Sequence, residues 1–198
     1  MYTDKTKQMD YIKTYDEFIN EFLIHGKNSD KVLVFDIDDT LIKSTAMVYV
    51  RKDGKIIKQL DSEEYNYYKL EPGEYFSYEE FGDIKKMLNA EIKPYFNTMK
   101  REYNKGVHIS ILTARANKNM IHDFFIKKAG IDIHPDLIFT TGDDQSNCTI
   151  SEKKAKCIKT LVNYGYRTLI FFDDNVDNLR EVKSMGNELK VKVHIIKA

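Results

Sequence analysis

The sequence predicts an α/β fold, with a doubly wound, mostly parallel sheet and helices on both of its faces. Short apolar runs of strand length alternate with longer segments of helical periodicity over the second half of the chain. Strands that alternate with helices are joined by right-handed crossovers, which make neighbouring strands parallel. Three of the apolar runs also end directly in polar residues, and in such sheets ligands bind beyond the carboxyl ends of the strands.

Length and charge favour one ordinary globular domain. The chain has 198 residues, which fits a single domain over residues 1–198. Lys and Arg number 31, as do Asp and Glu, so no overall field attracts nucleic acid or a membrane, and stable nucleic-acid binding is not indicated. No apolar run approaches the roughly 18 residues of a membrane helix. The first residues lack the apolar core of a signal peptide, so we expect a cytoplasmic protein.

The first predicted element is an extra N-terminal helix over residues 9–25. Gly26 follows it as a helix stop. The apolar side chains that recur at helical spacing are Ile12, Tyr15, Phe18, Ile19, Phe22 and Leu23. The first strand comes next, over residues 32–35, and it is apolar throughout, as expected for a strand that is buried on both faces.

An insertion over residues 43–83 follows the first strand. Residues 46–60 read as two short strands around Asp53 and Gly54, a strong hairpin signal that predicts a small β-hairpin flap. Residues 61–83 are rich in aromatic and acidic side chains. These rings either form a small core under the hairpin or stack on a nucleobase. We favour the core.

The rest of the chain alternates regularly between helices and strands. The expected helices cover residues 84–103, 117–129, 151–164 and 176–185. The expected strands cover residues 107–112, 137–140, 168–172 and 191–196. A parallel sheet places the carboxyl ends of these strands at one edge, so polar groups far apart in the sequence meet there.

Acidic residues dominate two of the strand ends. Asp36 and Asp38 follow the first strand, and Asp173 and Asp174 follow the strand over residues 168–172. Carboxylates that converge in this way repel one another, and a cation between them removes the repulsion. An all-oxygen site of this kind suits Mg²⁺. Carboxylates two residues apart also divide labour, because one attacks a phosphorus atom while the other handles the leaving-group proton.

Four segments in this order resemble the motifs of the haloacid dehalogenase (HAD) superfamily. They are FDIDDTLI, ILTARAN, a lysine at a helix start and LIFFDDNVDN. The resemblance covers residues 31–196 and leaves out the N-terminal helix. It implies a HAD-like Rossmannoid fold and a phosphatase, that is, a phosphoric monoester hydrolase that uses Mg²⁺.

The resemblance also implies roles for individual residues. Asp36 matches the nucleophile that forms an aspartyl-phosphate and binds the metal. Asp38 matches the general acid and base, and its backbone carbonyl is expected to bind the metal as well. Thr113 is expected to donate a hydrogen bond to the phosphoryl group. Asp174 is the expected main metal ligand downstream, and Asp173 is either a second ligand or a group that orients the first.

The lysine of the third motif has more than one candidate. The segment TISEKKAKCIK offers Lys153, Lys154 and Lys156. Lys154 shares a helix face with Ile158 and Leu161, which points it inward. We therefore predict that Lys154 neutralises the nucleophile and binds the substrate phosphate, with Lys153 as the second choice.

The remaining polar residues near the strand ends are less clearly placed. Arg115 either binds a substrate phosphate through a bidentate contact of its guanidinium or lies on the surface. Asp39 is expected to form a turn, and Asp143 and Asp144 are expected in a solvated loop. Two residues of the last motif are expected to support the site: Asp177 and Asn178.

Neither interval between the motifs is long enough for a full cap domain, so the resemblance implies a small, nearly capless enzyme. An open site accepts large substrates, such as phosphorylated ends of polymers or proteins, or else relies on oligomer contacts to cover it. The expected partner is a phosphorylated small molecule or polymer end as substrate. The leading hypothesis is a Mg²⁺-dependent phosphomonoester hydrolase that acts through an aspartyl-phosphate on Asp36, with a nucleotide or polynucleotide phosphate as substrate. The alternatives are a phosphotransferase that uses the same intermediate and a non-catalytic binding module on a HAD scaffold.

Overall fold

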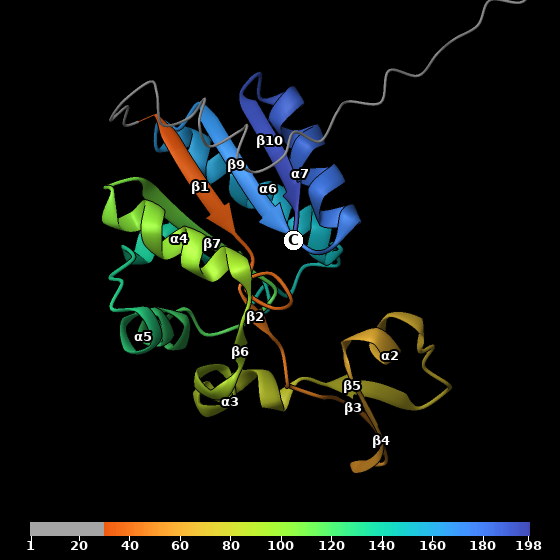
Figure 1. The fold of residues 1–198 in the computed structure, drawn as a ribbon. Helices are drawn as coiled ribbons and strands as arrows, with labels where there is room; N and C mark the ends of the chain where they lie inside the picture. The colour runs from red at the N-terminus through yellow and green to blue at the C-terminus, as the bar shows by residue number, and fades with distance from the viewer. Residues whose placement is uncertain (1–29) are drawn as a thin grey trace, which may run out of the picture.

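The computed structural model describes residues 30–198, so the predicted helix over residues 9–25 lies outside the described part of the chain. Its centre is a parallel sheet in the strand order β10–β9–β1–β7–β8 (Figure 1). These strands are β1 (Lys31–Phe35), β7 (His108–Thr113), β8 (Ile138–Thr140), β9 (Thr168–Asp173) and β10 (Lys192–Lys197). The predicted α/β class with a mostly parallel sheet is therefore confirmed.

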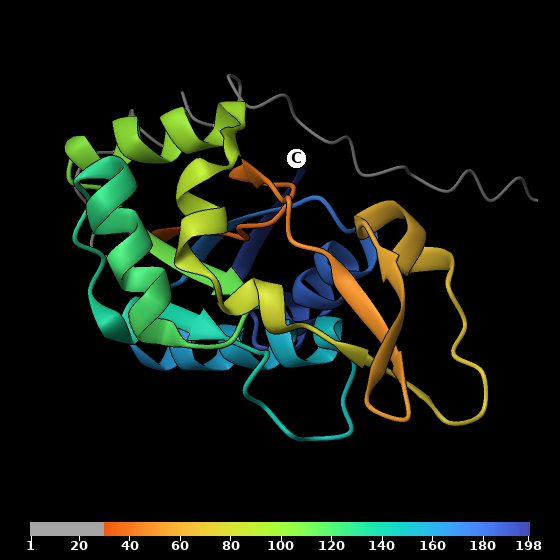
Figure 2. The same cartoon turned by 90° about the horizontal axis from the view of Figure 1, so that it is seen from below.

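Helices cover both faces of this sheet. One face carries α4 (Pro94–Asn104) and α5 (Lys118–Ala129), and the other carries α6 (Ile150–Asn163) and α7 (Val176–Glu188) (Figure 2). In β1, Leu33 and Phe35 belong to the core that includes residues of α4 and α5, whereas Val32 and Val34 belong to the core with α6 and α7. All four side chains are fully buried. The apolar run in the sequence thus reflects a strand that is covered on both faces.

The strand order places a topological switch point at β1. The chain runs from β1 outward to β7 and β8 and then returns to β9 and β10 on the other side of β1. A short 3₁₀ helix, η2 (Pro135–Leu137), leads into β8. Ligand sites in open α/β sheets lie at such switch points, beyond the carboxyl ends of the strands.

The predicted single helix over residues 84–103 is wrong. The structure has α3 (Ile84–Asn89), a short strand β6 (Glu91–Ile92) and then α4, which starts at Pro94. Proline is favoured in the first turn of a helix but forces the residue before it out of the helical region. Lys93 accordingly has extended backbone angles, with φ −89° and ψ 161°. β6 pairs with β2 (Ile42–Lys43) in an antiparallel ladder.

The insertion after β1 contains more than the predicted hairpin. Its elements are β3 (Val48–Lys52), β4 (Lys55–Leu60), α2 (Ser62–Tyr67), β5 (Glu74–Ser77) and η1 (Glu79–Gly82), a 3₁₀ helix. The hairpin of β3 and β4 is confirmed, and Asp53 and Gly54 both have positive φ, as a tight hairpin turn requires. The third strand β5, which pairs with β3, was not expected. Figure 1 shows the insertion beyond the carboxyl ends of the central strands.

The aromatic segment over residues 61–83 forms a small core, as favoured from the sequence. Val48, Val50 and Leu60 are buried there, and four rings pack against them: Tyr65, Tyr68, Phe76 and Phe81. Other rings of the segment stay at the surface, and Tyr67 is 81% exposed. Among the helices of residues 30–198, none combines the length and apolar character that crossing a membrane requires.

Close packing of α7 on β10 gives a prediction for stability. A Cβ added at Gly186 would lie 2.8 Å from Val193 Cβ and closer still to Val193 Cγ2. Overpacking of this kind costs about 1–3 kcal/mol, while alanine returns only about 1 kcal/mol as a better helix former. We expect Gly186→Ala to lower the free energy of unfolding by about 1 kcal/mol in urea denaturation.

A matched glycine serves as the control. A Cβ at Gly82 would meet no atom within 4 Å, so Gly82→Ala should not show this loss. The penalty of Gly186→Ala should also shrink when Val193 is replaced by alanine, because the two side chains are in direct contact. An unchanged or higher urea midpoint for Gly186→Ala would show that the packing of α7 on β10 is looser than described.

Candidate active site

The acidic residues at the ends of β1 and β9 meet at the switch point. The two strands pair in parallel with Phe35 opposite Phe172, so the residues that follow them, Asp36 and Asp173, are neighbours. The rings of Phe35 and Phe172 stack with centroids 4.4 Å apart, which fixes the strand ends against each other. Asp36, Asp173 and Asp174 each offer a carboxylate oxygen, and these oxygens lie within 4.8 Å of one another. Such a cluster is able to hold a divalent metal ion.

Lys154 lies inside this carboxylate cluster. Its Nζ is 2.8 Å from Asp36 Oδ1 and 2.7 Å from Asp173 Oδ2, and its side chain is 1% exposed. Lys153 instead donates to the backbone carbonyl of Asp144 at 2.6 Å. The register of α6, which begins with a capping box at Thr149, thus turns Lys154 inward and leaves Lys153 at the edge.

Burial and mutual repulsion raise the pKa values of the carboxylates. Burial raises the pKa of Asp36 well above its ordinary value, and Asp173 and Asp38 add to this, while Lys154 opposes it. Burial, followed by Asp173 and Asp39, raises the pKa of Asp174 to about 6. Burial alone would lower the pKa of Lys154, but the two carboxylates beside it raise the pKa overall, so its ammonium stays charged. Three carboxylates around one ammonium leave an excess of negative charge that a further cation would offset.

Asp173 is held by donors of the protein itself. Besides Lys154, it accepts hydrogen bonds from Asn178 Nδ2, at 3.0 and 3.1 Å, and from the backbone N–H of Asn175 at 2.8 Å. Asn178 is therefore brought into the site, where it orients Asp173. Asp177 is not brought into the site, because its side chain is mostly exposed and pairs with Arg180.

Thr113 ends β7, on the other side of β1 from Asp173. It is fully buried, and its Oγ1 accepts a hydrogen bond from the backbone N–H of Arg115 at 3.2 Å. Its carbonyl accepts from the backbone N–H of Thr141 at 2.9 Å and from the Thr141 hydroxyl at 3.2 Å. The structure thus brings Thr113 to the same edge of the sheet as Asp36 and fixes its backbone there.

The alternative that Arg115 lies on the surface is wrong, because the residue is buried, with 3% exposed. Its guanidinium also does not stand free for a phosphate. Nε lies 2.8 Å from Asp38 Oδ2 and Nη2 lies 2.7 Å from Asp38 Oδ1, a bidentate pair. Nη1 donates to the backbone carbonyl of Phe81 at 2.7 Å. The side chain expected to hold substrate therefore holds Asp38 and the insertion.

The other acidic residues have the loop roles expected of them. Asp39 has a φ of 55° and accepts from the backbone N–H of Ser44 at 3.4 Å, and its carbonyl accepts from Lys93. Asp143 and Asp144 are exposed: Asp143 accepts from the backbone N–H of Asn117 at 3.0 Å, and Asp144 accepts from the backbone N–H of Ser146 in its own loop at 2.8 Å. Lys93 and Phe81 were not foreseen, because contacts across some 50 or 30 positions leave no local pattern in the sequence.

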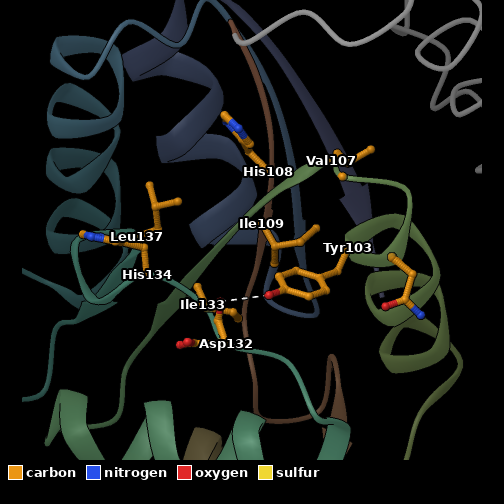
Figure 3. Close-up of a pocket in the computed structure, with 10 residues that line it drawn as sticks. Tyr103, Val107, His108, Ile109, Asp132, Ile133, His134 and Leu137 are labelled. Carbon is orange, nitrogen blue, oxygen red and sulfur yellow. Dashed lines mark hydrogen bonds between the residues drawn. The ribbon is translucent and has the colours of Figure 1, made fainter.

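A cavity of about 400 Å³ lies elsewhere in the described part of the chain (Figure 3). It is near the start of β7, where His108 and Ile109 line it, and so it lies toward the end of the strand opposite to Thr113. Tyr103 and Asp132 both line it, and the Tyr103 hydroxyl donates to the backbone carbonyl of Asp132 at 3.0 Å (Figure 3). None of the predicted site residues lines this cavity.

Comparison with protein-family models identifies the family of the chain. A family model described as HAD superfamily, subfamily IIIB (acid phosphatase), matches residues 2–197. No curated protein matches the chain. A similar solved structure is the HAD domain of the effector protein Lem4 from Legionella pneumophila, with 10% sequence identity, a TM-score of 0.48 and 85% of each chain covered. The chain therefore belongs to the acid phosphatases of HAD subfamily IIIB, and it is a phosphatase.

Proposed function

We propose that this phosphatase is a Mg²⁺-dependent phosphomonoester hydrolase that acts through an aspartyl-phosphate on Asp36. The observation that supports this most strongly is the cluster at the switch point. There, the carboxylates of Asp36, Asp173 and Asp174 lie close together, and the buried ammonium of Lys154 pairs with Asp36 and Asp173. The proposed nucleophile and the proposed metal ligands thus lie close to one cationic side chain, which supports phosphoryl transfer at this cluster.

The donor set fits Mg²⁺. All candidate ligands are oxygens, and hard oxygen ligands are the ones that Mg²⁺ prefers. Asp36, Asp174 and the backbone carbonyl of Asp38 would hold the ion, with Asp173 as a further ligand or as the group that orients the others. When bound, the ion supplies positive charge that neutralises the repelling carboxylates and the charge that develops on the phosphoryl oxygens.

The side chains of the protein divide the chemistry as follows. An oxygen of Asp36 forms a bond to phosphorus while the bond from phosphorus to the leaving oxygen breaks, and Asp38 gives that oxygen its proton. Lys154 and the Thr113 hydroxyl offset the charge of the transferring group. In the second half, water attacks the aspartyl-phosphate, Asp38 takes the proton, and inorganic phosphate leaves with Asp36 restored.

The proposed substrate is a nucleotide or a polynucleotide phosphate. Support comes from the insertion, where Tyr67, Tyr75 and Tyr78 stay exposed at 81%, 48% and 48%. Exposed rings of this kind stack on nucleobases without strong sequence preference. The insertion lies beyond the carboxyl ends of the strands, on the side of the molecule where the cluster is found (Figure 1).

A substrate screen tests this proposal. The panel should hold nucleotides, 3′- and 5′-phosphorylated oligonucleotides, sugar phosphates and phosphopeptides, each assayed for inorganic phosphate with Mg²⁺. We expect the highest kcat/KM among the nucleotide or oligonucleotide substrates. A preference for sugar phosphates or phosphopeptides would overturn the substrate class. Transfer of the phosphoryl group to added glycerol in place of water would identify a phosphotransferase.

Metal affinity should depend on pH. Because the pKa of Asp174 is about 6 and that of Asp36 is also raised, protons compete with Mg²⁺ for the site in acid. Because these carboxyl pKa values are raised, the metal-free site takes up protons as the pH falls through 6. The affinity for Mg²⁺ should therefore fall below pH 6, by up to about tenfold per pH unit. Calorimetric titration with Mg²⁺ on either side of this pH checks it.

The exposed Asp177 provides a control for this titration. Asp177→Asn removes a carboxylate of the same motif that does not join the cluster, so it should leave the pH dependence unchanged. Asp174→Asn should weaken Mg²⁺ binding at every pH. Equal affinities of the unmodified protein on the two sides of pH 6 would contradict the raised pKa of the site carboxylates.

A further inference from the structure

We propose that Arg115 and Phe81 are positioning residues that tie the insertion to Asp38, so that Asp38 transfers its proton efficiently only when the insertion is seated. This inference rests on the proposed function, because it concerns the step assigned to Asp38. It goes further by giving the insertion a part in the chemistry. The residues concerned, Asp38, Arg115 and Phe81, are called the linkage below.

The first part of the linkage is the pair of Arg115 and Asp38. The Arg115 side chain is 2% exposed, and both oxygens of Asp38 accept from it, at 2.8 and 2.7 Å. A bidentate pair of this kind fixes the plane of the carboxylate as well as its position. The Asp38 side chain is 22% exposed, so one side of it remains open toward a substrate. Arg115 therefore decides the direction in which Asp38 presents its proton.

The second part is the contact between Arg115 and the insertion. Nη1 of Arg115 donates to the Phe81 carbonyl at 2.7 Å, and the guanidinium carbon lies 5.0 Å from the centroid of the Phe81 ring. A ring at this distance attracts the cation through its π electrons. A buried guanidinium needs acceptors for its donors, and the Phe81 carbonyl accepts from Nη1, the one nitrogen that does not donate to Asp38. Without Phe81 in place, the guanidinium would lose an acceptor and a packing surface together.

The third part of the linkage is the attachment of Phe81 to the rest of the insertion. Phe81 lies in η1, and its ring packs on the small core of Val48, Val50 and Leu60. The preceding Glu80 accepts from the Met47 backbone N–H at 2.7 Å and from the Tyr49 hydroxyl. The ion pair of Glu79 with Arg51 of β3, at 3.0 Å, adds to this attachment, whereas the ion pair of Glu80 with Lys86, at 2.5 Å, joins η1 to α3. η1 is therefore attached to the sheet of the insertion through Met47, Tyr49 and Arg51.

The nucleophile has no such dependence. Asp36 accepts a hydrogen bond from Lys154 of α6, and Lys154 also donates to Asp173 at the end of β9, so none of these groups belongs to the insertion. Breaking the linkage should thus impair protonation of the leaving group while attack by Asp36 continues. This selectivity separates a positioning role from a role in binding phosphate, because a lost phosphate contact would weaken all substrates alike.

Leaving-group dependence is the readout that distinguishes these roles. An alkyl phosphate such as glycerol 2-phosphate needs a proton on its leaving oxygen, whereas p-nitrophenyl phosphate releases a stable phenolate without one. Values of kcat/KM report the first half of the reaction, up to formation of the aspartyl-phosphate, for both substrates. General acid catalysis contributes about 10²–10⁴-fold, so Arg115→Met should lower kcat/KM for the alkyl phosphate by about 10²-fold and for the aryl phosphate by less than about tenfold.

Phe81→Ala is the second variant, and it keeps the backbone carbonyl while removing the ring. It should change the ratio of the two kcat/KM values in the same direction, by about tenfold. In a protein that already carries Asp38→Asn, neither change should lower the alkyl rate further, because the group that they position is gone. Ile57→Ala, on the exposed strand β4 of the insertion, is the control and should leave the ratio unchanged.

The outcomes separate cleanly. An equal fall for both substrates in Arg115→Met would overturn the proposal and assign Arg115 to phosphate binding. An unchanged ratio in Phe81→Ala would overturn the part played by the insertion, and this variant decides the matter if Arg115→Met does not fold. If the unmodified protein with Mg²⁺ hydrolyses neither of these two substrates nor any substrate of the screen above, the proposed function has failed rather than the linkage.

Discussion

Asp36→Asn should reduce the hydrolysis of p-nitrophenyl phosphate by at least about 10⁴-fold, because an amide oxygen does not form a stable bond to phosphorus as a carboxylate does. No other carboxylate takes its place readily. Asp173 accepts hydrogen bonds from Lys154 and Asn178. Asp38 accepts two hydrogen bonds from the guanidinium of Arg115. The measurement is kcat/KM in the presence of Mg²⁺.

The same variant should fold normally. Asparagine has nearly the shape of aspartate, and burial already makes the charge of Asp36 costly, as its raised pKa shows. Lys154 keeps Asp173 as a partner at 2.7 Å. The circular dichroism spectrum should therefore match that of the unmodified protein, and the melting temperature should stay close to it. Loss of folding would leave the assignment to be decided by trapping of the aspartyl-phosphate on the unmodified protein.

A matched control removes a carboxylate from the same end of the molecule. Asp143 is exposed and accepts from the Asn117 backbone N–H, a bond that the oxygen of asparagine also accepts. Asp143→Asn should retain nearly full activity. Substantial turnover by Asp36→Asn, beside an equally active Asp143→Asn, would refute Asp36 as the nucleophile.

Removal of divalent metal should have the second large effect. Treatment with EDTA should lower activity by at least about 10³-fold, because the carboxylates of Asp36, Asp173 and Asp174 would then repel the incoming phosphate with only Lys154 to offset them. Added Mg²⁺ should restore activity. Ca²⁺ should restore little, since its longer bonds and looser coordination suit in-line transfer poorly.

The metal experiment has its own control. The chelator is removed by dialysis before activity is measured, so that inhibition by EDTA itself is separated from loss of metal. Thermal stability is followed in parallel, and Mg²⁺ should raise the melting temperature of the dialysed protein by binding only the folded state. Full activity in the dialysed protein without added metal would contradict the proposed use of Mg²⁺.

Much of the fold and of the candidate site follows from the sequence for a physical reason. A strand buried on both faces must be apolar throughout, so β1 and β9 stand out, and parallel pairing then brings their ends together. This is why the sequence predicts Asp36, Asp173 and Asp174 at one site although Asp36 is more than 130 positions from the other two. Helix periodicity likewise separated Lys154 from Lys153.

The parts that sequence reasoning missed depend on contacts rather than on local pattern. The break before Pro94 was overlooked because the apolar spacing continues across it, although the proline itself was the available signal. Strand β5 is four residues long and gains its stability by pairing with β3, which no local periodicity shows. The attachment of Arg115 to Phe81 joins residues 34 positions apart, and only the folded insertion brings them together.

A crystal structure with Mg²⁺ and beryllium fluoride, a mimic of the transferred phosphoryl group, tests the central claim most directly. We expect the beryllium to be bonded to a carboxylate oxygen of Asp36, with Mg²⁺ between Asp36 and Asp174 and with Lys154 beside the mimic. Beryllium fluoride on another side chain, or a metal ion bound away from Asp36 and Asp174 with these two side chains turned apart, would contradict the account.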